Sequence, residues 1–323
     1  MERKEYRLID ILKFCFACLI PLLHIPFIDN SFLFLIRQYL ARLGVPFFFA
    51  ASGIMLTISI SKRGKREACI RYIKRIGIML LIWLIIYAPL LINEMKEETY
   101  ILQIQQLIFR TPAFLWYLTA VIVAVFLILV LKNEKLVGIV SVGGYLIGTW
   151  FGGSYSWLSG GALWYERIFL TTRNGIFFGL PMMYVGYLVE KTHNKKKNLS
   201  LKLLFSKGLF WSVILMIEIT IVQKNMLQES DCSMYFSMPF VIYYLLLGAV
   251  NYNKIQIKTK RLRGCSTAIY VVQYGVITVI SKIVVFLNLN NNYAWTACWG
   301  IVLIAGIILY CVSNKFSFFK YLT

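Results

Sequence analysis

The sequence predicts an all-α membrane protein, a polytopic helical bundle of about ten transmembrane helices with both termini in the cytoplasm. Of its 323 residues, 59% are hydrophobic and 15% charged, and the mean hydropathy is +0.70. Soluble domains have about 45–50% apolar and about 25% charged residues. The apolar residues also form runs of about 18 or more, the length that crosses a bilayer core as a helix. The third observation is an uneven distribution of basic residues between alternate loops.

Ten apolar runs are predicted to be helices, because a helix pairs its backbone groups internally, whereas an open strand edge would leave them unpaired in lipid. The run at 136–152 gives the weakest signal, since it is short and rich in glycine. The predicted spans are, in order, 8–28, 42–61, 76–93, 113–131, 136–152, 174–190, 203–222, 234–252, 265–287 and 294–313.

The loops between these spans predict the orientation. If the N-terminus is cytoplasmic, 24 of the 34 Lys and Arg residues lie on the cytoplasmic side, 7 lie on the opposite side, and 3 lie within spans. Cytoplasmic loops of membrane proteins carry an excess of Lys and Arg, so both termini are expected in the cytoplasm. The net charge of +20 is therefore explained by topology first and by contact with anionic lipid second. No basic soluble domain is present to bind nucleic acid.

The chain is predicted to be one integral-membrane domain, 1–323, in the cell membrane, with no appended soluble domain. A cleavable signal peptide is not expected, because Asp10 and Lys13 interrupt the first apolar run. Most of the seven cysteines fall inside spans, which argues against a disulfide framework. No Cys/His spacing indicates a metal site. The oligomeric state cannot be read from the sequence.

Three ionisable residues lie in the first span, where charge is costly and commonly functional. At about 100° and 1.5 Å per residue, Lys13 and His24 share one helix face, separated by roughly 16 Å. Asp10 lies one turn before Lys13 and is its candidate partner. Pro21 is expected to kink the helix beside His24. The alternative is that His24 caps the span at the interface and that Lys13 snorkels.

Several other polar features carry a functional and a structural interpretation. Arg71 and Arg75 lie one turn apart before the third span, where they could bind phosphates or simply flank the membrane. Ser52, beside Gly53, is explained by close helix packing. Trp116 and Tyr117 are typical of an interfacial aromatic belt.

Three further residues are placed by the spans alone. Arg173 begins the sixth span on the outer side. Glu218 and Lys282 lie inside the seventh and ninth spans, where each is costly unless it is paired. An ion pair between the two is one candidate.

An ordered set of motifs covers nearly the whole chain. It comprises KFCFACLIPLLH from Lys13 to His24, VPFFFAASG from Val45 to Gly53, the basic pair Arg71 and Arg75, LWYL at 115–118, RNGIFFGLP at 173–181 and STAIY at 266–270. The set resembles the integral-membrane acyltransferase 3 family. It is most similar to the membrane half of the membrane-bound serine racemases of vancomycin-resistance type, notably in RNGIFF and in SMYFSMPFVIYYLL at 233–246.

The resemblance implies a bacterial enzyme that moves an acyl group, acetyl above all, from cytoplasmic acyl-CoA to a hydroxyl or amine of a cell-envelope glycan, lipid or small molecule. It implies His24 as general base, either in direct transfer or through an acyl-His intermediate. Lys13, Arg71 and Arg75 would bind the CoA phosphates. The supporting residues would be Asp10, Ser52, Trp116, Tyr117, Arg173, Tyr270 and Gln273.

Two residues depart from the pattern of the family. Lys13 stands where Arg is frequent, so a bidentate phosphate contact is lost. Gln273 stands where the late helix usually carries His, and an amide cannot titrate. Two other functions therefore stay open: transport or supply of a small amino acid such as L-serine, and an inactive scaffold for proteins of wall synthesis.

Overall fold

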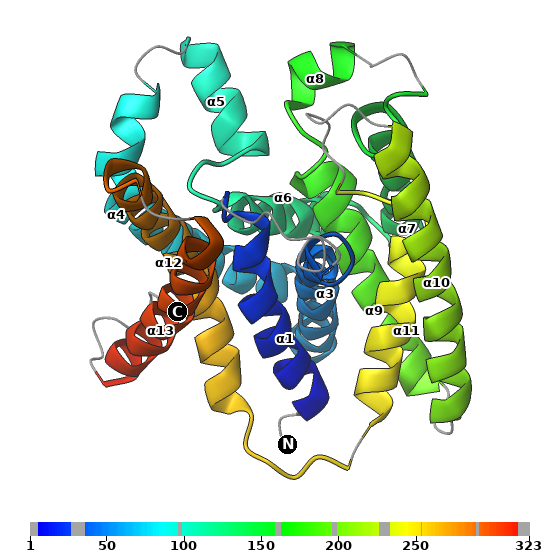
Figure 1. The fold of residues 1–323 in the computed structure, drawn as a ribbon. Coiled ribbons are helices and arrows are strands. Elements are labelled where there is room, and N and C mark those ends of the chain that lie inside the picture. The colour runs from blue at the N-terminus through cyan, green and yellow to red at the C-terminus, as the bar shows by residue number, and fades with distance from the viewer. Residues whose placement is uncertain are drawn as a thin grey trace. The chain divides into compact units, whose positions relative to one another are not determined.

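The computed structural model describes residues 6–26, 36–95, 99–158, 163–195, 199–225, 233–252, 254–288 and 291–315. All secondary structure in these ranges is helical, as the sequence predicts (Figure 1). The chain forms two compact units. The terminal unit comprises Met1–Val45, Leu81–Ala88 and Asn253–Thr323, and the central unit comprises Pro46–Leu80 and Pro89–Tyr252.

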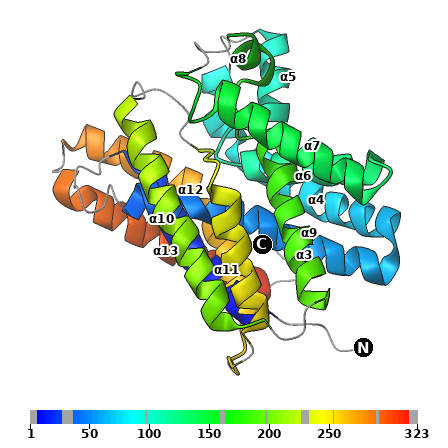
Figure 2. The same cartoon turned by 90° about the vertical axis from the view of Figure 1, so that its right-hand side faces the viewer.

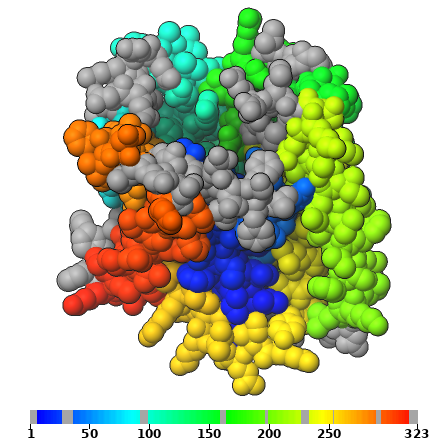
Figure 3. All heavy atoms as spheres, in the orientation of Figure 1, coloured from blue at the N-terminus to red at the C-terminus, as the bar shows by residue number. Residues whose placement is uncertain are grey.

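In the terminal unit, α1 (Arg7–Leu19) packs against α12 (Lys260–Phe286), which packs in turn against α13 (Asn291–Lys315). Gly306 of α13 faces the backbone of Ile269 so closely that a Cβ there would clash. The indole nitrogen of Trp299 donates to the carbonyl of Cys18 at 2.7 Å, and α1 lies beside α13 in the space-filling view of Figure 3. Gly306 thus allows close contact between α12 and α13, and α1 contacts both of these helices.

The remaining elements of the terminal unit are short. After α1 come η1 (Ile20–Leu23), η2 (Ile36–Leu40) and η3 (Ala41–Leu43), of which η2 is π-helical and the other two are 3-10 helices. One stretch of the long helix α4 (Lys65–Met95), namely Leu81–Ala88, completes the unit. The helix α1 is therefore followed by irregular turns rather than continuing as a regular α-helix.

The central unit contains most of the helices. Its members are α3 (Gly44–Arg63, from Pro46 onward), the rest of α4, α5 (Tyr100–Phe109), α6 (Trp116–Val130), α7 (Glu134–Ile147), η4 (Gly148–Gly152), α8 (Leu163–Phe169), η5 (Gly175–Gly179), α9 (Leu180–Lys195), α10 (Leu201–Asn225) and α11 (Met238–Asn251). Figures 1 and 2 show α9, α11 and α10 side by side in that order.

Two glycines set the distance between α3 and α9. A Cβ on Gly53 would clash with the carbonyl oxygen of Met183, and a Cβ on Gly186 would clash with that of Ala50. The two helices therefore cross at backbone contact. Small residues at such crossings are the usual means of close packing between membrane helices, which confirms the packing interpretation of the Ser52–Gly53 element.

Each of the ten expected spans overlaps a helix, but among the described residues six helices are long and apolar enough to cross a membrane. These are Ile36–Arg63, Lys65–Leu91, Glu134–Gly152, Leu201–Asn225, Lys260–Phe286 and Tyr293–Lys315. Three shorter apolar helices are Tyr100–Phe109, Trp116–Val130 and Met238–Asn251. The first expected span, 8–28, is an α-helix only to Leu19, and its last two residues lie outside the described ranges. The number of ten spans and the cytoplasmic termini stay predictions.

Large apolar side chains cover much of the helical surface. On α10, Phe205 is 74% exposed, and Phe210 and Ile217 are more than half exposed. On α12, Val285 is 74% exposed. Water-soluble monomers rarely expose apolar patches on this scale, so the surface is that of a membrane protein.

Candidate active site

The expected site residues are divided between the two units. The terminal unit holds Asp10, Lys13, His24, Tyr270 and Gln273. The central unit holds Ser52, Arg71, Arg75, Trp116, Tyr117 and Arg173.

His24 lies where the first helix changes its geometry. After Leu19 the chain tightens into η1, with Pro21 in its first turn, and the amide of His24 caps η1 by donating to the carbonyl of Pro21 at 3.0 Å. Proline lacks an amide hydrogen and cannot continue the α-helical ladder. The break beside His24 is therefore the predicted effect of Pro21.

This break separates Lys13, on α1, from His24, at the end of η1. A 3-10 helix turns about 120° per residue, compared with about 100° in an α-helix, so the spacing of a regular α-helix does not apply beyond Leu19. The alignment of Lys13 with His24 on one face stays a prediction. Both side chains are partly buried.

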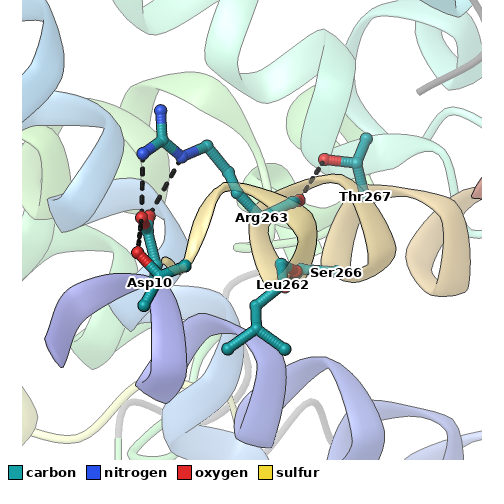
Figure 4. Close-up of polar contacts among 6 residues, drawn as sticks. Asp10, Leu262, Arg263, Ser266 and Thr267 are labelled. Carbon is teal, nitrogen blue, oxygen red and sulfur yellow. Dashed lines mark hydrogen bonds and ion pairs between the residues drawn. The ribbon is translucent and has the colours of Figure 1, made fainter. Parts of the chain in front are cut away.

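Asp10 forms the strongest ionic contact at the start of α1. It is 2% exposed, and its two carboxylate oxygens accept from Nε and Nη2 of Arg263 at 3.0 and 2.8 Å. The hydroxyl of Thr259 also donates to Asp10 at 2.8 Å. Figure 4 shows both guanidinium nitrogens directed at the carboxylate. Such bidentate, charge-assisted contacts are strong and directional, so they fix the start of α1 to the start of α12.

The late helix α12 carries a second group of polar residues. The hydroxyl of Tyr87 donates to the carbonyl of Val271 at 2.6 Å and accepts from the amide of Gly275 at 3.4 Å. Gln273 lies between these two positions and is 1% exposed. Neither its amide nitrogen nor its amide oxygen has a hydrogen-bond partner among the described residues. Tyr270 lies one turn earlier and is partly buried.

In the central unit, Ser52 and Tyr117, which belong to two different motifs, are in hydrogen-bond contact. The two hydroxyl oxygens are 3.1 Å apart. Tyr72 of α4 also hydrogen-bonds Ser52 and lies near the charge of Arg75. The sequence analysis does not single out Tyr72, although Tyr72 lies between the two expected phosphate ligands, Arg71 and Arg75.

Aromatic rings surround this polar cluster. The ring of Phe49 lies 4.5 Å from that of Tyr117, 6.1 Å from that of Trp116 and 5.7 Å from that of Phe178. Offset and edge-to-face contacts of this kind are favourable. Trp116 and Tyr117 are therefore packed into the central unit rather than being only an interfacial belt.

The two expected phosphate ligands differ in their surroundings. Both Arg71 and Arg75 are exposed. Nη2 of Arg71 pairs with Glu67 at 2.8 Å, one turn away on α4. This exposed pair is weak, so a phosphate could displace it at small cost.

The segment around Arg173 is shaped by its neighbours. Asn174 caps η5, where its side-chain oxygen accepts from the amides of Ile176 and Phe177 at 2.9 and 3.1 Å. The hydroxyl of Thr171 accepts from the amide of Arg173 at 3.1 Å. The RNG element therefore forms the N-terminal turn that leads into η5 and α9, with the partly exposed side chain of Arg173 at its start.

Glu218 is satisfied within the central unit. Its carboxylate accepts from Tyr155 at 2.6 Å, from the amides of Phe236 and Ser237 at 2.6 and 3.0 Å, and from the hydroxyl of Ser237. Lys282 is exposed on α12. A salt bridge is therefore not needed to explain this partly buried acid.

Arg263, Thr259, Tyr87 and Tyr72 are the polar residues that sequence reasoning missed. All four lie far in sequence from the groups they contact, or on a different helix, so no local spacing could have identified them. Arg263 is one of the 24 Lys and Arg residues that the predicted topology places on the cytoplasmic side.

Comparison with known proteins gives one match. A family model described as an acyltransferase domain, Acyl_transf_3, covers residues 6–312. No curated protein and no solved structure matches the chain. The family match includes every expected site residue.

Proposed function

Because the chain belongs to the acyltransferase 3 family, whose model covers residues 6–312, we propose that it transfers an acyl group from cytoplasmic acyl-CoA to an acceptor at the cell envelope. The acyl group proposed first is acetyl, and the acceptor is a hydroxyl or amine of a glycan, a lipid or a small molecule. The observation that carries the proposal is this family match over a helical chain with apolar, membrane-crossing helices.

His24 is proposed as the general base. It removes the proton from the acceptor hydroxyl or amine as that atom attacks the thioester carbon. The tetrahedral intermediate then collapses, the carbon–sulfur bond breaks, and the CoA thiolate leaves and is protonated. Base catalysis of this kind is typically worth about 10²–10⁴-fold. The interruption of the first helix at Pro21 supports the assignment, because irregular backbone in a membrane protein commonly lines a functional cavity.

Lys13, Arg71 and Arg75 are proposed to bind the CoA phosphates. Arg71 and Arg75 support this role because they are exposed on one face of α4, and the only pairing described for Arg71 is a weak surface one. Lys13 contributes a single cation on α1. Each basic group is expected to change the Michaelis constant for acyl-CoA more than the turnover number.

The test is transfer of label from radiolabelled acetyl-CoA in inside-out membrane vesicles. We expect His24→Ala to lose transfer by about 10²–10⁴-fold. His193→Ala is the matched control, because His193 hydrogen-bonds Asn251 at 3.0 Å, between α9 and α11, and has no proposed role. Equal labelling by wild type and His24→Ala would overturn the proposal.

Transport or supply of a small amino acid such as L-serine is the second candidate. Two features favour it: the resemblance to the membrane half of serine racemases, and an amide at Gln273 that cannot exchange protons. Uptake of labelled serine by proteoliposomes tests this function. Saturable uptake together with no acyl transfer would replace the first proposal, and uptake equal to that of empty liposomes would exclude the second.

A further inference from the structure

Gln273 is a buried polar group whose hydrogen bonds are missing. Its side chain is 1% exposed, and among the described residues neither its nitrogen nor its oxygen has a partner. Buried polar groups in folded proteins are nearly always paired, and each exception calls for an explanation. An amide both donates and accepts, so whatever satisfies Gln273 must offer an acceptor and a donor.

Tyr87 contacts the backbone on both sides of Gln273. Its hydroxyl donates to the carbonyl of Val271 at 2.6 Å and accepts from the amide of Gly275 at 3.4 Å. The ring of Tyr274 packs 5.1 Å from that of Tyr87. The turn of α12 that carries Gln273 is therefore in direct contact with Tyr87, which comes from a different helix.

The level of Gln273 along the first helix follows from the anchor between Asp10 and Arg263. Both helices start at this anchor and run in the same direction (Figure 1). Gln273 lies ten residues beyond Arg263, about 15 Å along the axis, which places it level with about Ile20. At this level η1 packs against α12.

Gln273 therefore lies between two of the expected site residues along the axis. Lys13 is about 10 Å below this level, and His24 is four 3-10 residues, about 8 Å, above it. In the proposed reaction Lys13 holds phosphate and His24 meets the thioester. The part of acyl-CoA that joins these two ends is the pantetheine arm, which contains two secondary amides.

We propose that Gln273 binds the pantetheine arm of acyl-CoA. The side-chain nitrogen of Gln273 donates to an amide carbonyl of the arm, and its side-chain oxygen accepts from an amide N–H. Gln273 is thus a binding residue for the donor and takes no part in proton transfer. This inference depends on the proposed function for the identity of the donor, but its binding test does not require turnover.

The experiment compares Gln273→Met, which keeps the length of the side chain, with Ser141→Ala. Ser141 is also a buried side chain whose oxygen has no hydrogen-bond partner in the described part of the chain, and it lies on α7 of the central unit. Binding of acetyl-CoA is measured by calorimetry on purified protein in detergent. We expect Gln273→Met to weaken binding by about 10- to 100-fold, as the loss of two hydrogen bonds implies, and Ser141→Ala to leave it unchanged.

A second measurement tests whether the effect of Gln273→Met depends on the pantetheine arm of the donor. The thioester S-acetyl-mercaptoethanol lacks both amides, so transfer from it should be equal in wild type and Gln273→Met, whereas transfer from acetyl-CoA should fall. Equal loss with both donors would overturn the inference. Equal binding of acetyl-CoA by wild type and Gln273→Met would also overturn it.

Thermal unfolding without ligand separates binding from structure. Removing an unpaired buried amide should leave Tm unchanged or raise it, in Gln273→Met and in Gln273→Leu alike. A lower Tm in both variants would show that the amide already has a partner in the ligand-free protein, and would overturn the inference. If His24→Ala transfers as well as wild type while Gln273→Met still weakens binding, the general-base role of His24 fails and the binding site stands. If wild type transfers no label while Gln273→Met still weakens binding, the proposed function fails and the binding site stands.

Discussion

At the scale of single residues, the best-defined interactions join positions that no sequence spacing relates. Asp10 meets Arg263 and Thr259, and Glu218 meets Tyr155 and the chain before α11. Both acids are predicted membrane residues, where an uncompensated charge is costly. In each case several donors satisfy the carboxylate, so the acid stabilises a junction between helices.

Removing either partner of the Asp10–Arg263 pair is expected to destabilise the protein. Asp10→Asn and Arg263→Leu should each lower the free energy of unfolding by about 2–3 kcal/mol, since each leaves a charged group without its partner, while the side chain of Arg263 keeps some solvent contact. The measurement is thermal unfolding in detergent. Arg261→Leu, an exposed neighbour on α12, is the control and should change stability by less than about 0.5 kcal/mol.

The double variant sharpens this prediction. Asp10→Asn combined with Arg263→Leu should be more stable than the sum of the single losses, because neither charge is then left behind. Additive losses would mean that the two residues act independently.

Glu218 provides a second test at this scale. Glu218→Gln replaces one acceptor oxygen by a donor nitrogen that would face the amide and hydroxyl of Ser237. We expect a loss of about 1–3 kcal/mol in the free energy of unfolding, read as a lower Tm. Lys282→Ala should leave Tm unchanged. A loss in Tm comparable to that of Glu218→Gln would instead support the Glu218–Lys282 ion pair that the sequence analysis offered as a candidate.

At the scale of elements, irregular turns lie next to two of the expected site residues. The first helix tightens at Ile20, before His24, and a π-helical turn follows Arg173 and precedes α9. Irregular turns of this kind are frequent at functional sites. Pro21 explains the first interruption, and the cap by Asn174 marks the start of the π-helical turn before α9.

The crossing of α3 and α9 yields a prediction about elements. Gly53→Ala and Gly186→Ala should each destabilise the protein by about 1–3 kcal/mol or prevent folding, because the new methyl group meets a backbone carbonyl that cannot move aside. Gly143→Ala on α7 is the control: nothing lies within 4 Å of its added Cβ, so it should be neutral or stabilising by up to about 1 kcal/mol. Equal effects at the three sites would contradict the close crossing.

At the scale of the whole molecule, the distribution of basic residues makes a prediction about topology. Because 24 Lys and Arg residues lie on one side and 7 on the other, we expect the C-terminus in the cytoplasm. A fluorescent protein fused after Thr323 should fluoresce, and alkaline phosphatase fused there should be inactive. The same reporters inserted after Gly161 should give the opposite pattern, and matching signals at both positions would contradict the predicted orientation.

The sequence by itself determined the all-helical fold class and the family. Hydrophobic runs and the exclusion of unpaired backbone from lipid leave helices as the one arrangement, and each expected span overlaps a helix. The ordered motifs from Lys13 to Tyr270 resemble the acyltransferase 3 family, whose model matches the chain. Ser52 and Tyr117, 65 positions apart, belong to two of those motifs and are in contact.

Only the tertiary structure decided how these groups are held. Periodicity describes a regular helix, so it could not register that α1 ends at Leu19 and that the chain continues as the 3-10 turn η1 before His24. It offered Asp10 a neighbour on its own helix, while the contacts described for its carboxylate lie 249 and 253 positions away. It also could not reveal that Gln273 is buried beside Tyr87 with no hydrogen-bond partner among the residues that the structure describes. The physical reason is that sequence spacing encodes contacts along one helix, whereas burial and pairing are set by the helices that pack against it.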